Sequence, residues 1–184
     1  MAPEGPAPLG VFVGLATLAV IQRADRVPGP TEKITASWQA CAAGGPAANA
    51  AVVFAALGGR ARLLTAIGSG PAAGIIREDL ERHGVEVVDA GPVSGADAAI
   101  SSVIVNTLTG ERSVVTRDAA GHDVGAPEDL DRLLDGAVVV LLDGHHPRLA
   151  AAAGRSAAGQ QVPVVLDAGR WRPVWDELLP AARA

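Results

Sequence analysis

The stretch from Gly44 to Gly59 combines two adjacent glycines, Gly44 and Gly45, with a proline and one isolated polar residue, Asn49. Glycine permits close backbone approach and Pro46 suits the first turn of a helix. The stretch therefore predicts a helix whose exposed N–H groups can receive a polar ligand. The amide of Asn49 both donates and accepts hydrogen bonds, which suits two neighbouring sugar hydroxyls. The same residues also fit a tight turn and a core helix that carries a solvated asparagine.

Two aspartates end strand-like runs further along the chain. Asp143 follows VVVLL, and Asp167 follows VPVVL. The carboxyl ends of parallel strands form the edge at which α/β sheets bind ligands. Asp143 is therefore a candidate for substrate binding, and Asp167 a candidate for positioning a phosphate or a metal.

A second glycine-rich turn resembles a dinucleotide-binding fingerprint. Gly68, Gly70 and Gly74 lie between a strand pattern and a helix pattern, and Asp89 follows 21 residues after Gly68. The third glycine comes one position late for the fingerprint, so the spacing argues against NAD binding and for a structural turn.

Two further groups of residues could suggest other chemistry. The run Asp143-Gly144-His145-His146 contains metal-ligand types, but adjacent histidines rarely converge on one ion and no third nitrogen or sulfur ligand has suitable spacing. We expect these histidines to line the mouth of a pocket or to cap the helix that begins at Pro147. A hydrolase set is disfavoured because no G-x-S-x-G elbow occurs. Its members would be Ser101, Ser102, His122 and Asp123.

The elements that must position these residues alternate along the chain, which predicts an α/β fold with a largely parallel sheet and helices on both faces. Strand-like runs occur at Val11–Val20, Arg60–Ile67, Val85–Val88, Ala137–Leu142 and Val162–Asp167. Helical patterns occur at Ala47–Leu57, Pro71–His83, Pro127–Leu134 and Pro147–Ala158.

Two stretches, 32–42 and 98–117, interrupt this alternation because neither has a helical period. The second contains two alternating runs around Thr109-Gly110, which predicts a β-hairpin. We assign both stretches to a small β lid, and residues 1–31, 43–97 and 118–184 to the α/β core.

Composition narrows the possible partners. The chain has 184 residues, a formal net charge of −5 and no run of Lys or Arg, which argues against nucleic acid or anionic lipid as a partner. Its one cysteine, Cys41, excludes a disulfide framework within the chain and fits a cytoplasmic location. A helix over Ala47–Leu57 would span roughly 16 Å, about half a bilayer core, so no membrane partner is expected.

The combined motifs resemble those of the ribokinase (pfkB-type) carbohydrate kinase family, and most closely its ketohexokinase-like members. The Gly-Gly turn with Asn49 is similar to the first family signature. FVGLATLAVIQRADRVP is similar to the opening strand and turn, IGSGPAAGIIREDLERHGV to the second strand and helix, and TGERSVV to a lid strand. The similarity runs in order over residues 11–180. It implies a three-layer α/β sandwich with a parallel central sheet and a small β lid, its C-terminal part missing, and a homodimer formed through the lid.

The resemblance also implies residue roles. Gly44, Gly45 and Asn49 match sugar-contacting positions, Asp143 matches an acidic residue near the substrate, and Arg112 matches an arginine that reaches nucleotide phosphates. The resemblance further implies a sugar or nucleoside as substrate, and ATP with Mg²⁺ for the complete enzyme.

Ala19 departs from the family, which usually has an aspartate there. Its side chain accepts no hydrogen bond from a sugar, a loss worth roughly 1.5–3 kcal/mol. Thr17 lies close enough in sequence to recover part of it.

A larger departure concerns catalysis. The family takes its base and phosphate cradle from a Gly-Ala-Gly-Asp loop and organises metal with an Asn-x-x-Glu motif, and neither occurs in these residues. No catalytic residue is assigned, and we expect the chain not to catalyse by itself. Two hypotheses follow: an ATP-dependent sugar kinase of which this chain carries the sugar-side half and lid, or a non-catalytic remnant that binds a polyol or dimerises through its lid.

Overall fold

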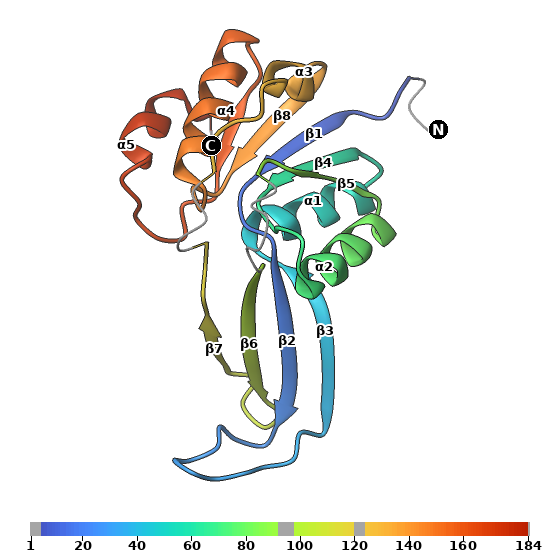
Figure 1. Cartoon of the computed structure of the whole chain (residues 1–184), viewed down its shortest axis with the longest axis vertical. Coiled ribbons are helices and arrows are strands. Elements are labelled where there is room, and N and C mark those ends of the chain that lie inside the picture. The colour runs from blue at the N-terminus through green and yellow to red at the C-terminus, as the bar shows by residue number, and fades with distance from the viewer. Residues whose placement is uncertain (1–4, 92–97, 120–123, 184) are drawn as a thin grey trace.

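A parallel sheet of five strands forms the core of the chain (Figure 1). The computed structural model describes residues 5–91, 98–119 and 124–183. The strands lie in the order β5, β4, β1, β8, β9, and every neighbouring pair is parallel. Their bounds are Leu9–Val13 for β1, Arg60–Thr65 for β4, Val85–Asp89 for β5, Ala137–Leu142 for β8 and Val164–Leu166 for β9. The predicted α/β class with a parallel central sheet is confirmed.

Helices cover both faces of this sheet and complete three layers. Phe12 of β1 and Leu63 of β4 pack in one buried cluster with the first two helices, while Val13 and Leu64 pack in the opposite cluster with the others. Successive strand residues point to opposite faces, so these apolar pairs supply both cores. The first two helices are α1 (Pro46–Ala56) and α2 (Pro71–Arg82); the others are α3 (Leu130–Leu134), α4 (Pro147–Gly159) and α5 (Trp175–Leu178). A short 3₁₀ turn, η1 (Leu179–Ala181), follows α5.

A second, mixed sheet of four strands projects from one end of the core (Figure 1). Its order is β3, β2, β6, β7; β2 pairs antiparallel with β3 and parallel with β6, and β6 pairs antiparallel with β7. The bounds are Thr17–Ala24 for β2, Trp38–Gly44 for β3, Ala99–Asn106 for β6 and Arg112–Thr116 for β7. The hairpin predicted around Thr109-Gly110 is present as β6 and β7.

The run Val11–Val20, predicted as one strand, is divided between the two sheets. β1 ends at Val13 and β2 begins at Thr17. Between them, the backbone N–H groups of Leu15 and Ala16 donate to side-chain oxygens, Asp143 Oδ2 and Thr65 Oγ1, and not to backbone carbonyls of a neighbouring strand. The hydrophobic pattern of a sequence contains no information about such side-chain acceptors. The pattern is therefore continuous over residues 11–20, although the strand is interrupted.

The division at Gly14 also moves β2 from where the sequence analysis placed it. Residues 1–31 were assigned to the α/β core, yet β2 is hydrogen-bonded between β3 and β6 of the small sheet. The remaining boundaries between core and lid stay a prediction.

Gly14 offers a direct test of this crossing between sheets. A Cβ built at Gly14 would lie 1.9 Å from Asp143 Oδ1, so Gly14→Ala must displace a buried carboxylate. We expect a loss of about 3 kcal/mol or more in the free energy of unfolding, measured by urea denaturation. The matched control is Gly74→Ala within α2, where a new Cβ meets no atom within 4 Å. It should stabilise the chain by about 0.5–1 kcal/mol through helix propensity. Equal effects of the two substitutions would contradict this account.

Candidate active site

One cavity of about 800 Å³ is lined by the small sheet and by core segments that include the start of α1 and the loops after β8 and β9. This cavity is lined by all seven residues that the sequence analysis predicted to bind substrate or cofactor: Thr17, Gly44, Gly45, Asn49, Arg112, Asp143 and Asp167. They come from β2, the end of β3, the start of α1, β7, and the segments that follow β8 and β9. The structure thus brings the predicted residues together, and their roles in binding stay a prediction.

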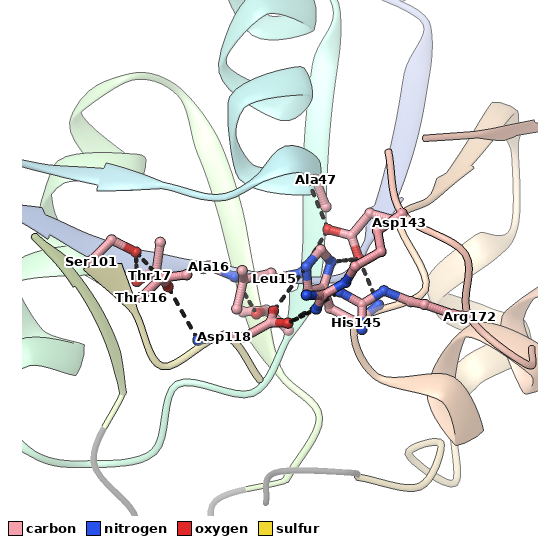
Figure 2. Close-up of polar contacts among 12 residues, drawn as sticks. Leu15, Ala16, Thr17, Ala47, Ser101, Thr116, Asp118, Asp143, His145 and Arg172 are labelled. Carbon is pink, nitrogen blue, oxygen red and sulfur yellow. Dashed lines mark hydrogen bonds and ion pairs between the residues drawn. The ribbon is translucent and has the colours of Figure 1, made fainter. Parts of the chain in front are cut away.

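Asp143 is fully buried at the base of this cavity, and its carboxylate is held by backbone donors (Figure 2). Oδ2 accepts from Leu15 N at 2.9 Å and from Ala47 N at 3.1 Å, and Oδ1 accepts from His145 N at 3.0 Å. The donors belong to the β1–β2 crossing, the first turn of α1 and the loop after β8. One carboxylate therefore fixes three segments that form the cavity wall.

The pKa of Asp143 follows from this environment. Burial raises the pKa, but the hydrogen bond and charge of His145 outweigh it, together with the backbone N–H groups of His145 and Leu15, and hold the pKa below its usual value. Asp143 is therefore a buried anion at neutral pH. Its charge also faces the N-terminal end of α1, where a helix dipole favours negative charge.

The glycine turn before α1 adopts the geometry that the sequence analysis required of it. Gly45 is the N-cap of α1 with φ 111°, and a Cβ there would lie 2.2 Å from the carbonyl oxygen of Leu15. Only glycine allows the two segments to approach so closely. Asn49 is the exposed residue of the first turn of α1, and its own N–H donates to the Gly45 carbonyl at 2.8 Å.

Three hydroxyl groups line the small-sheet side of the cavity (Figure 2). Thr17 Oγ1 donates to the Ala99 carbonyl at 2.7 Å, and Ser101 Oγ donates to Thr116 Oγ1 at 2.8 Å. Because each hydroxyl has one proton, Thr17 and Ser101 can offer a ligand only acceptor lone pairs. Thr116 Oγ1 also accepts from the N–H of Asp118 at 3.1 Å and keeps its proton for donation.

A cluster that sequence reasoning missed closes another side of the cavity. Asp118 Oδ2 accepts from Arg170 Nη2 at 2.6 Å and from Arg172 Nη2 at 3.2 Å. His145 lies between two carboxylates, with Nε2 2.9 Å from Asp118 Oδ1 and Nδ1 3.0 Å from Asp143 Oδ1 (Figure 2). Burial raises the pKa of Asp118, but the charge of His145, the N–H of Ala119 and Arg172 hold it below its usual value. In the sequence, the one sign of this cluster is that Arg170 and Arg172 follow shortly after the end of a predicted strand.

The structure places the other candidate residues from the sequence analysis as follows. His145 lines the cavity, and His146 is buried at the N-cap of α4 without a side-chain capping bond. Ser101 belongs to the hydroxyl chain, whereas His122 and Asp123 lie outside the described residues. Ala19 lines the cavity with a methyl group and accepts no hydrogen bond, whereas Thr17 donates its proton to Ala99 and keeps lone pairs that could accept one from a sugar.

The described residues do not fit a complete nucleotide–metal site. Among residues 5–91, 98–119 and 124–183, no group of three or more His, Cys, Asp or Glu side chains could hold a metal ion. Arg112 of β7 and Asp167, just after β9, are exposed and line the cavity, and their roles toward a phosphate or a metal stay a prediction. Within the same residues, no helix is long and apolar enough to cross a membrane.

Comparison with known proteins identifies the family of this chain. The profile of the pfkB family carbohydrate kinases matches residues 9–183, so the chain belongs to that family of carbohydrate kinases. Over 152 residues it is 33% identical to an ATP-dependent ribose-1-phosphate kinase of Halopiger xanaduensis, covering 82% of this chain and 51% of the relative. Over 119 residues it is 30% identical to the ketohexokinase of Mus musculus, covering 63% and 39% respectively.

Solved structures show the same architecture. The Arabidopsis thaliana ribokinase complexed with ribose and ATP superposes with a TM-score of 0.74 at 24% identity, covering 96% of this chain and 58% of that one. The chain thus spans about half the length of the relatives it matches. The predicted ribokinase-like sandwich with a β lid is confirmed. The predicted membership of the pfkB family is confirmed as well.

Acid denaturation tests the buried carboxylate of Asp143. Since its folded pKa lies below the unfolded value of about 3.9, its contribution to stability is complete above that value and is lost as pH falls through the folded pKa. Asp143→Asn should lower the free energy of unfolding at pH 7 by about 3 kcal/mol or more and flatten its decline below pH 4. Asp25→Asn, at an exposed position, is the matched control. An unchanged acid limb in Asp143→Asn would refute the assignment.

Proposed function

We propose that this chain supplies the sugar-binding side and the lid of a kinase that transfers the γ-phosphoryl group of ATP to a hydroxyl of a sugar or nucleoside. The observation that carries the proposal is the shared cavity, which the glycine turn and Asn49 of α1 line together with three hydroxyl groups of the small sheet. Membership of the pfkB family supports the reaction class. The cytoplasmic location stays a prediction.

The donors and acceptors of the cavity suit a polyhydroxylated ring. Asn49 can donate and accept at once, Thr17 and Ser101 accept, and Thr116 donates. Asp143 already receives three backbone N–H groups. We therefore infer that it acts on the sugar mainly by holding the glycine turn in place. Uncharged contacts of this kind orient a sugar, and they leave the chemistry of transfer to groups near the phosphate.

The nucleotide side of the proposal rests on fewer residues. Arg112 on β7 is an exposed cation at the cavity and is positioned to contact a phosphate of the donor. Asp167 follows the last core strand and stands at the same edge. ATP would supply the phosphoryl group when bound, and the name of the Arabidopsis thaliana complex, which contains ATP, supports that donor.

A homodimer through the lid is part of the same proposal. Trp38 and Val114 are large apolar side chains with 45% and 48% exposure, and the strand register places both on the same face of the small sheet. Exposed apolar side chains gathered on one sheet are typical of protein contact surfaces. Sedimentation velocity that shows only monomers at high micromolar concentration would contradict the dimer.

Sugar binding by the chain tests the proposal at Asn49. Calorimetric titration with a panel of pentoses, hexoses and nucleosides should give saturable binding at one site for at least one of them. Asn49→Ala should weaken that binding roughly tenfold, because about two neutral hydrogen bonds are lost. Gln39→Ala removes a comparable amide from an exposed position of β3 away from the cavity and should leave affinity unchanged.

Phosphoryl transfer is followed by ³¹P NMR on the protein purified from its own source with Mg-ATP and the sugar that binds. Formation of a sugar phosphate supports the kinase. Binding of none of the sugars or nucleosides by the chain would contradict the proposed function.

A further inference from the structure

Asp118 stands at the corner where the last strand of the small sheet returns to the core, and three potential cations surround it. Its Oδ2 is shared by Arg170 and Arg172, and its Oδ1 lies against His145 (Figure 2). Asp118 is one of three non-glycine residues with positive φ among those described, at 61°. Such a backbone persists when its surroundings hold it, and it is found often at ligand sites.

The two guanidinium groups of this cluster carry more N–H donors than Asp118 uses. Each guanidinium carries five N–H donors, and Asp118 takes one from Arg170 and one from Arg172. The neighbouring carboxylate of Asp143 accepts from three backbone N–H groups and lies 3.0 Å from His145 Nδ1, and among the described residues it forms no ion pair with either arginine. Both arginines line the cavity that contains the glycine turn.

The loop that carries the arginines is held in place by the core. Trp175 is buried, and its indole Nε1 donates to the carbonyl of Arg170 at 2.9 Å. The side chain of Arg172 is only 20% exposed, whereas that of Arg170 is 70% exposed. Arg172 is therefore a fixed donor, and Arg170 is a solvated cation whose pairing with Asp118 is weak and easily exchanged.

We propose that Arg170 and Arg172 form a subsite for a phosphate or carboxylate group on the ligand, and that Asp118 fills this subsite in the ligand-free chain. Placing that anionic group on the acceptor sugar rests on the proposed function. An incoming anion displaces Asp118 and bridges the two guanidinium groups, which match planar or tetrahedral oxyanions with paired hydrogen bonds.

Ala19 agrees with an anionic acceptor. An aspartate at this position of the cavity wall would add a negative charge beside the ligand, and alanine adds none. The substitution therefore removes repulsion toward an anion while it removes a hydrogen bond to a neutral sugar. The subsite and Ala19 together favour a phosphorylated or acidic sugar over a neutral one.

Calorimetric titration of the chain with a pentose phosphate and with the matching unphosphorylated pentose tests the subsite. The pentose phosphate should bind roughly tenfold more tightly than the pentose. Arg172→Gln should abolish this difference in affinity. Arg172→Lys keeps the charge but loses the planar guanidinium group, and it should restore part of the difference. Arg155→Gln is the matched control, because Arg155 is 66% exposed and pairs with Glu177 away from the cavity.

The phosphate affinity of Asp118→Asn distinguishes the proposed subsite from a merely structural role of Asp118. Asparagine tolerates the same backbone and removes the competing charge, so phosphate affinity should rise several-fold, while loss of fold would lower it. Equal affinity for the two pentoses in the unmodified chain, or no gain in Asp118→Asn, would overturn the subsite.

Two further titrations separate the sources of the anion. If Arg172→Gln weakens the binding of ATP but not of the pentose phosphate, the assignment to the acceptor is overturned. If inorganic phosphate binds in an Arg172-dependent manner while no sugar binds, the subsite stands and the proposed function fails.

Discussion

The carboxylate of Asp143 is the interaction on which the site depends. Burying an anion costs several kcal/mol unless hydrogen-bond donors replace water, and here three backbone N–H groups and His145 do so. The donors come from segments far apart in the chain, 128 residues in the case of Leu15 and 96 in the case of Ala47. A single side chain thereby joins the β1–β2 crossing, the glycine turn before α1 and the loop after β8.

Several features of the molecule follow from this requirement. Gly14 leaves room for the carboxylate, and Gly45 lets the turn before α1 touch the Leu15 carbonyl. His145 extends the network to Asp118, and through it to Arg170 and Arg172. Polar contacts between charged groups and backbone therefore connect the two sheets at the cavity. Apolar packing also joins them, because Leu18 of β2 belongs to the core cluster that contains α1 and α2.

Much of the fold was predictable because it depends on local patterns. The core strands at 60–65, 85–89 and 137–142 and the helices after Pro46, Pro71 and Pro147 follow apolar periodicity and proline position closely. The break at Gly14 was not predictable in this way, because it depends on a hydrogen bond to Asp143, which is remote in sequence. The site shows the same contrast: Gly44, Gly45 and Asn49 carry a motif, whereas Asp118, Arg170 and Arg172 meet only through the tertiary fold.

Amide hydrogen exchange followed by NMR tests the central role of Asp143 most directly. The N–H groups of Leu15, Ala47 and His145 should be protected in the chain and should lose protection together in Asp143→Asn, while Leu63 in the sheet core stays protected. Independent changes at these three amides, or protection that survives the substitution, would contradict the account.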